Sequence, residues 1–235
     1  LAGNTKPDTI EFMATILITG ANRGIGFALA KAYRDEGHRV IGTVRDLSRA
    51  ADLTDIGAEV RELDVTSDRS VKILRELLRG APVDVLINNA GTSGSESFGS
   101  LDYAAFSKVI ETNVFGPLRV TETLVDNLAA GKMKKVASIS SHMGSISTVN
   151  TPWAIPYRTS KAALNMAMRS VAIDLSMKGI TTLVLHPGIV ETDMGGKGAP
   201  VKPHESAAGL KKVIEDAENM GELQFLDYQG RVLPW

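Results

Sequence analysis

The sequence predicts one α/β domain, built as a doubly wound, seven-stranded and mainly parallel sheet with helices on both faces. Two observations predict it. Short apolar runs rich in β-branched residues alternate with longer amphipathic stretches along the 235 residues, as strands and helices do in parallel α/β folds. Most of the short runs are almost continuously hydrophobic, which is typical of parallel strands buried on both faces.

The candidate elements follow one another in strict alternation. The expected strands are Thr15–Thr19, Val40–Val44, Glu59–Leu63, Val83–Asn88, Lys135–Ser140, Thr181–Leu185 and Gln224–Asp227. The expected helices are Ile25–Glu36, Arg69–Arg79, Asp102–Asn113, Pro117–Ala130, Pro156–Lys178 and His204–Met220. Gly37 and Gly179 are natural helix stops, because glycine accepts the left-handed conformation that ends many helices. Ligands of such folds bind at the carboxyl ends of the strands, so motifs that directly follow a strand are the candidate ligand contacts.

Composition excludes several classes of function. A formal net charge of −1 gives no global basic field for nucleic acid or a membrane surface. The absence of cysteine excludes disulfides, thiol catalysis and zinc–thiolate sites. The four histidines are scattered, so no metal site is expected. No apolar run approaches the roughly 18 residues of a membrane span, and we expect a cytoplasmic protein.

One domain is expected over residues 13–235. Residues 1–12 are polar and precede Met13, so we interpret them as a tag remnant or a disordered tail. Residues 195–203 form the stretch richest in glycine and proline and are the expected mobile substrate loop. The loop 142–155 is expected to form part of the substrate wall with Trp153.

A glycine-rich turn joins the first strand to the first helix. Glycines let the backbone approach a pyrophosphate closely, and the new helix N-terminus offers free N–H groups and a favourable dipole. A tight turn without a ligand is the alternative, but the position after the first strand favours a dinucleotide. The residues expected to contact it are Gly20, Asn22, Arg23, Gly24, Ile25 and Gly26.

The motifs together resemble the short-chain dehydrogenase/reductase family. They occur in that family's order and cover the chain from Met13 onward. They are Thr19-Gly20-x-x-x-Gly24-x-Gly26, Asn88-Asn89-Ala90-Gly91, Asn113, Ser140-Ser141, Tyr157-x-x-x-Lys161 and Pro187-Gly188-x-x-x-Thr192. The resemblance implies a Rossmann-type domain and a nicotinamide-dependent oxidoreductase.

A narrower resemblance points to the branch of the family that holds sniffer-type carbonyl reductases and bacterial C-factor signalling proteins. It rests on Tyr157-Arg-Thr-Ser-Lys161, His186-Pro-Gly, Thr192-Asp-Met-Gly-Gly196 and Tyr228-x-Gly-x-x-Leu-x-Trp235. The family implies a small-molecule carbonyl or alcohol substrate, and nothing in the sequence selects among such substrates. The branch also leaves open an alternative function, that of an NADP(H)-binding signalling or regulatory protein.

The end of the second strand favours NADPH over NADH. An acidic residue usually binds the ribose hydroxyls of NAD at this position, whereas here Val44 is followed by Arg45. Arg23 and Arg45 suit a 2′-phosphate through charge-assisted hydrogen bonds. Asp46 is the complication, since it could take the hydroxyl position instead. The resemblance adds further cofactor contacts at Asp64, Val65, Asn89, Ala90, Gly91, Pro187, Gly188, Val190 and Thr192, together with Tyr157 and Lys161.

Tyr157 and Lys161 are the candidate centre of the chemistry. Lys161 follows Tyr157 by four residues on one helix, so it lies on the same face and is expected to lower the pKa of the phenol. Tyr157 is then the general acid and base. By resemblance Ser141 binds the substrate carbonyl oxygen, with Ser140 as its competitor, and Asn113 anchors a proton-relay water. Family resemblance also suggests a homodimer through 117–130 and 156–178.

Overall fold

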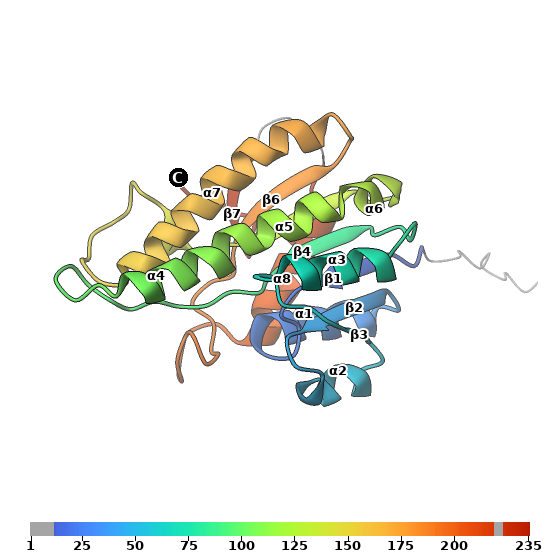
Figure 1. The fold of residues 1–235 in the computed structure, drawn as a ribbon, viewed down its shortest axis with the longest axis horizontal. Coiled ribbons are helices and arrows are strands. Elements are labelled where there is room, and N and C mark those ends of the chain that lie inside the picture. Colours follow the sequence, from blue (N-terminus) through green and yellow to red (C-terminus); the bar gives the residue numbers. More distant parts are fainter. Residues whose placement is uncertain (1–11, 219–222) are drawn as a thin grey trace, which may run out of the picture.

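The computed structural model describes residues 12–218 and 223–235 and confirms the predicted sheet. The strand order is β3-β2-β1-β4-β5-β6-β7, and all six pairings are parallel (Figure 1). The strands are β1 Thr15–Ile18, β2 Arg39–Val44, β3 Glu59–Glu62, β4 Val85–Asn88, β5 Lys135–Ile139, β6 Thr181–His186 and β7 Phe225–Asp227. The chain crosses from β3 to β4 over the sheet, so that β1 and β4 are neighbours at the topological switch point.

Helices cover both faces of the sheet, as predicted. One face carries α1 and α8, while α3, α5 and α7 lie over the other (Figure 1). The helices are α1 Gly24–Asp35, α2 Ala51–Asp55, α3 Asp68–Leu77, α4 Tyr103–Ile110, α5 Gly116–Thr123, α6 Val125–Ala130, α7 Ile155–Ser176 and α8 Pro203–Asp216. None of these helices within 12–218 and 223–235 has the length and apolar character needed to cross a bilayer.

Successive residues of a strand pack into two separate hydrophobic cores, one on each face of the sheet. In β1, Ile16 and Ile18 pack beneath α1 and α8, whereas Leu17 packs on the other face. The same alternation places Val85 and Leu86 of β4 in opposite cores. Side chains of a strand point alternately to its two faces, so a strand that is apolar at every position belongs between two helical layers. The continuous hydrophobic runs in the sequence therefore arise because each strand is covered by helices on both faces.

The helical connection before β5 differs from the sequence prediction. The expected helix Asp102–Asn113 begins at Tyr103, because the Asp102 side chain accepts from the Ala104 and Ala105 amides as an N-cap. It then widens into a π-helical segment, Glu111–Phe115. The expected helix Pro117–Ala130 divides into α5 and α6 at Leu124, where φ is −103° and the chain leaves the helical conformation.

Two further helices differ from the sequence prediction, and some predicted segments lie outside the described residues. The helix α2 was not predicted from its short, polar sequence. The expected helix His204–Met220 begins one residue earlier and ends at Asp216, and residues 219 and 220 are outside the described part of the chain. The expected tail 1–12 also lies outside it except for Phe12.

Candidate cofactor and catalytic site

The glycine turn exposes the N-terminus of α1. Gly20 and Gly24 adopt φ of +64° and +56°, a conformation that favours glycine. Arg23 is the N-cap in extended backbone, and no side chain in the described chain caps the helix. The first turn also contains no acidic residue. The free N–H groups and the helix dipole therefore remain available for an anion such as a pyrophosphate.

Asn89, at the end of β4, holds this turn in shape. Its Nδ2 donates to the main-chain oxygens of Thr19 at 3.0 Å and Gly20 at 2.9 Å. Thr19 Oγ1 in return accepts from the amides of Asn89 and Ala90, each at 3.0 Å. A Cβ at Gly26 would come within 2.4 Å of both Asn89 Nδ2 and the Gly20 oxygen. The two glycine-containing motifs thus form one rigid unit across β1 and β4.

The segment after β6 lies against the same turn. The Thr192 side chain is 3.3 Å from where a Cβ of Gly24 would be, and Asp193 pairs with Arg23. Val190 is buried and bridges to Val201, which closes the base of the expected substrate loop 195–203. The structure therefore brings the motif Pro187–Thr192 together with the glycine turn, although the two are more than 160 residues apart in the sequence.

The arginines predicted to bind a 2′-phosphate lie on the surface beside this turn. Arg45 is exposed at the end of β2, and Arg23 is exposed in its pair with Asp193. Asp46, the potential competitor, is engaged locally: its Oδ1 accepts from Ser48 N at 3.0 Å and Ser48 Oγ at 2.6 Å. These hydrogen bonds hold the pKa of the Asp46 carboxyl below its usual value.

Asp64 and Val65 follow β3, the strand that pairs with β2 at the edge of the sheet. Asp64 Oδ1 accepts from Thr66 N at 2.9 Å and Thr66 Oγ1 at 2.7 Å, so the carboxylate stabilises a turn. Val65 is buried, and its Cγ2 lies 2.8 Å from a Cβ position at Gly116. Asp64 therefore has a structural role in addition to its predicted place beside the adenine.

Tyr157 and Ser141 meet at the carboxyl edge of the sheet. Tyr157 lies in the first turn of α7, and Ser141, just after β5, lies close enough to its hydroxyl to lower the pKa of the phenol. The neighbouring Ser140 points elsewhere, since its Oγ donates to Asn165 Oδ1 at 2.6 Å. Ser141 is thus the serine that faces the tyrosine, and Ser140 is part of the buried framework.

Lys161 lies one turn further along α7 and is buried, with 6% of its surface exposed. Its Nζ donates to the main-chain oxygen of Ile139 at 2.8 Å and is 5.7 Å from the centre of the Tyr157 ring. Burial lowers the pKa of Lys161 to about 8. Burial also raises the pKa of Tyr157, and the nearby Ser141 side chain opposes this. The expected lowering of the Tyr157 pKa is therefore wrong for the protein alone, because desolvation of the phenol dominates.

Asn113 is positioned by the π-helical segment. Its Nδ2 donates to Thr92 O at 2.8 Å and Ser160 Oγ at 2.9 Å, and its Oδ1 accepts from Thr92 N at 2.8 Å. A Cβ position at Gly91 lies 3.3 Å from Asn113 Oδ1 and 3.9 Å from Lys161 Nζ. Asn113, Gly91 and Lys161 consequently lie close together in the structure.

Sequence reasoning missed the residues that hold the site together. Thr19 Oγ1 accepts a hydrogen bond from the amide of Asn89, and Asn165 Oδ1 accepts a buried hydrogen bond from the hydroxyl of Ser140. Asn165 follows Lys161 by four residues, so their shared helix face was the available signal. The rings of His142 and His186 pack edge to face beside the site, with centroids 4.8 Å apart.

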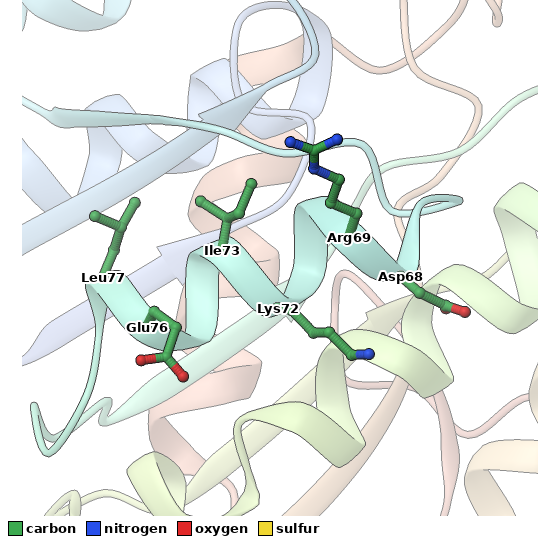
Figure 2. Close-up of a pocket in the computed structure, with 6 residues that line it drawn as sticks. All are labelled: Asp68, Arg69, Lys72, Ile73, Glu76 and Leu77. Atoms are coloured by element: carbon green, nitrogen blue, oxygen red, sulfur yellow. The ribbon is translucent and has the colours of Figure 1, made fainter.

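Two features away from this edge are weaker candidates. A surface hollow of about 580 Å³ is lined by α3 alone, by Asp68, Arg69, Lys72, Ile73, Glu76 and Leu77 (Figure 2). Elsewhere Glu36, His38 and Glu215 place possible metal ligands within 4.8 Å of one another. Lys211 already supplies the positive charge there, with Nζ 2.6 Å from Glu36 and 2.8 Å from Glu215.

Comparison with known proteins agrees with this geometry. A family model described as short chain dehydrogenase matches residues 14–201. C-signal of Myxococcus xanthus is 45% identical over 155 residues, which cover 66% of this chain and 93% of that protein. An NADPH-bound carbonyl reductase from chicken fatty liver is 30% identical, with a TM-score of 0.88 and coverage of 95% and 99%. Carbonyl reductase Sniffer of D. melanogaster is 29% identical, with a TM-score of 0.87 and coverage of 95% and 100%.

Proposed function

Because the chain belongs to the short-chain dehydrogenase/reductase family of oxidoreductases, we propose that it is an NADPH-dependent carbonyl reductase that uses Tyr157 as its general acid. The resemblance to the branch with sniffer and C-factor is confirmed by the relatives found. The observation that carries the proposal is that Ser141 lies beside the Tyr157 hydroxyl, with the buried Lys161 one helical turn away and its Nζ 5.7 Å from the centre of the Tyr157 ring.

The residues of the glycine turn fit a dinucleotide. The uncapped start of α1 offers N–H donors to a pyrophosphate, and Gly24 leaves the room that a side chain would occupy beside Thr192. Arg23 and Arg45 would hold the 2′-phosphate of NADP(H), while Asp46 is engaged by Ser48. Relatives crystallised with NADPH or NADP add support, since these cofactors are named for proteins of closely similar fold.

When bound, the nicotinamide supplies the hydride for the carbonyl carbon. Ser141 Oγ donates a hydrogen bond to the carbonyl oxygen and orients it. Tyr157 then gives its phenolic proton to that oxygen, which completes the alcohol and leaves a phenolate. The positive charge of Lys161 favours the phenolate and so promotes proton transfer. Asn113 holds the water through which the proton is replaced from solvent.

The Ser141 hydroxyl and the Lys161 ammonium group are largely shielded from water. Ser141 and Lys161 are 7% and 6% exposed, so their interactions with a reacting oxygen are screened little by water. In contrast, large apolar side chains are exposed on the loops around this edge, including Ile146, Trp153 and Met194. These surroundings favour a substrate with an apolar body and one reactive carbonyl group.

The similarity to C-signal favours a second candidate function, that of an NADP(H)-binding signalling or regulatory protein. The two functions can coexist. The presence of Asn113, Ser141, Tyr157 and Lys161 favours retained catalysis, because a protein that only binds the cofactor does not need a proton donor.

A homodimer is also proposed. Met166 and Ile173 share a face of α7 with Met177, the C-cap of that helix. These side chains are 67%, 69% and 78% exposed, which is unusual for large apolar side chains at spacings of seven and four residues. A second copy of the same helix would cover them. Sedimentation of the protein and of Ile173→Lys tests this, with a monomeric variant expected.

Steady-state oxidation of NADPH and NADH with a panel of aldehydes, quinones and α-dicarbonyls tests the proposed activity. We expect turnover with NADPH for at least one carbonyl compound. Tight NADPH binding without turnover across the panel would favour the signalling function. A preference for NADH would contradict the role assigned to the two arginines.

A further inference from the structure

The motif Tyr228–Trp235 has no part in the chemistry described so far, yet it folds into a well-defined structure. After β7 the chain turns back at Gly230, and Leu233 N donates to Phe225 O at 2.7 Å. The turn is held by the buried Asp227, whose carboxylate accepts from Arg231 N at 3.0 Å and from Arg231 Nε at 2.7 Å. The segment is therefore anchored to the edge of the sheet.

Trp235 connects this segment to the loop of the catalytic serine. Its main-chain oxygen accepts from Ser147 N at 3.1 Å, Ser147 Oγ at 2.9 Å and Ser145 Oγ at 3.2 Å. Its indole stacks on the fully buried Phe225, with ring centres 5.6 Å apart and planes 25° apart. Three hydrogen bonds to one acceptor, backed by a core aromatic ring, make this a firm point of attachment.

The attachment is close to Ser141 along the chain. Ser141 caps a single 3₁₀ turn, His142–Gly144, and its Oγ accepts from Met143 N at 3.2 Å. Ser145 ends the same turn, with its amide donating to His142 O at 3.0 Å. A Cβ position at Gly144 is 2.7 Å from the Lys161 backbone, so the turn packs tightly on α7. A shift at Ser145 is therefore transmitted to Ser141 through one stiff turn.

Tyr228 makes a comparable contact with the other loop of the site. Its ring comes within 3.1 Å of a Cβ position at Gly188, in the motif that follows β6. Its main-chain oxygen lies 2.2 Å from a Cβ position at Gly209 of α8, so two glycines are needed for the tyrosine to fit. The Gly188 backbone, with φ of +87°, thus rests directly on the Tyr228 ring.

We propose that Tyr228–Trp235 is a brace that positions the two loops of the active site: Trp235 positions Ser141, and Tyr228 positions Gly188. The inference rests on the proposed reductase function. Neither residue is a catalytic residue, since each acts through its neighbour. The brace predicts a separation of effects, because Ser141 acts on the carbonyl oxygen whereas the segment around Gly188 acts on the cofactor.

The kinetic test compares Trp235→Ala with Trp235→Phe and with Val232→Ala. Val232 is in the same segment and 64% exposed, so its variant controls for a general disturbance. Trp235→Ala should lower kcat between about 10- and 100-fold, the cost of a misplaced reacting group, with an unchanged Kd for NADPH. Trp235→Phe should restore most of the rate. Equal kinetics of Trp235→Ala and Val232→Ala would overturn the proposal for Trp235.

Tyr228→Ala provides the second arm. It should raise the KM for NADPH several-fold and change kcat less, and Tyr228→Phe should behave like the wild type because the ring alone makes the contact. A fall in kcat with an unchanged KM would overturn the assignment of Tyr228 to the cofactor loop.

Hydrogen exchange separates failure of the brace from failure of the proposed function. The amide of Ser147 donates to the main-chain oxygen of Trp235, which is held in place by the stacking of the indole on Phe225. Loss of the indole in Trp235→Ala should therefore loosen this bond, so amides over 142–147 should exchange faster in Trp235→Ala and at the wild-type rate in Val232→Ala. This readout needs no substrate. If no carbonyl is reduced by the wild type but the exchange difference is present, the brace is retained and the reductase function is rejected. Unchanged exchange in Trp235→Ala overturns the brace whatever the activity.

Discussion

Lys161 Nζ lies 5.7 Å from the centre of the Tyr157 ring and donates to the main-chain oxygen of Ile139 at 2.8 Å. The hydrogen bond to Ile139 fixes the buried lysine beside the phenol. Since burial lowers the pKa of Lys161 to about 8 and raises that of Tyr157, the ammonium group loses its proton first as the pH rises. Lys161, whose positive charge promotes proton transfer, is thus the group that loses its proton near neutrality.

Reductase activity should consequently fall at alkaline pH. The value of kcat/KM for NADPH reports the free enzyme and should decrease as the pH rises through about 8, where Lys161 becomes neutral. Lys161→Arg should move this limb to higher pH, because a guanidinium keeps its charge. A profile that is flat up to pH 10 in the wild type would rule out this role of the lysine.

Cofactor preference should depend on Arg45. Loss of a hydrogen bond between charged groups costs about 1.5–3 kcal/mol, so Arg45→Ala should raise the KM for NADPH roughly 10- to 100-fold and leave the KM for NADH unchanged. Arg49→Ala is the matched control, as Arg49 is equally exposed four residues away. The assignment is wrong if NADPH and NADH respond alike.

The glycine turn should not tolerate a methyl group at Gly26. A Cβ there would be 2.4 Å from the Gly20 oxygen and from Asn89 Nδ2, so Gly26→Ala must displace the turn and should abolish measurable NADPH binding. Gly37→Ala is the contrasting variant: its φ of +83° makes alanine unfavourable, but it is remote from the turn. It should lower the thermal midpoint and keep the Kd for NADPH. Equal affinities of both variants would refute the turn as the phosphate site.

Acid should destabilise the fold partly through His186. Burial and the neighbouring His142 lower its pKa from 6.5 to about 4, so the unfolded chain binds more protons than the folded one between these values. The free energy of unfolding must then decrease as the pH falls from about 6.5 to 4. Urea unfolding at pH 7 and 5 should show a smaller decrease in His186→Gln than in the wild type. The exposed His204→Gln should keep the wild-type decrease; an identical response of all three proteins would exclude His186 as the cause.

Most of the fold was predictable because it depends on local periodicity. Each predicted strand agrees with the structure to within two residues, since an apolar run between two turn signals leaves little choice of register. The division at Leu124 and the π-helical segment around Asn113 were not predictable. The π-helical segment depends on where the Asn113 side chain finds its partners, here Thr92 and Ser160, which lie 21 and 47 residues away.

The sequence predicts which residues belong to the candidate site, but it does not predict how their side chains are arranged in space. Ser140 and Ser141 must face opposite ways after β5, but only the hydrogen bond of Ser140 to Asn165 and the position of Ser141 beside Tyr157 show which serine faces the tyrosine. The pKa of Tyr157 depends on how deeply α7 is packed, which no spacing reveals. The contact between Trp235 and Ser145 spans 90 residues and had no sequence signal beyond the motif itself.

The most direct test of the account is the rate of carbonyl reduction by Tyr157→Phe beside the wild type and Tyr103→Phe, an exposed tyrosine on α4 as control. A general acid contributes about 10²- to 10⁴-fold, so kcat of Tyr157→Phe should fall by that factor with the Kd for NADPH unchanged, and Tyr103→Phe should match the wild type. Turnover by Tyr157→Phe within a few-fold of the wild type would contradict the central claim that this phenol supplies the proton.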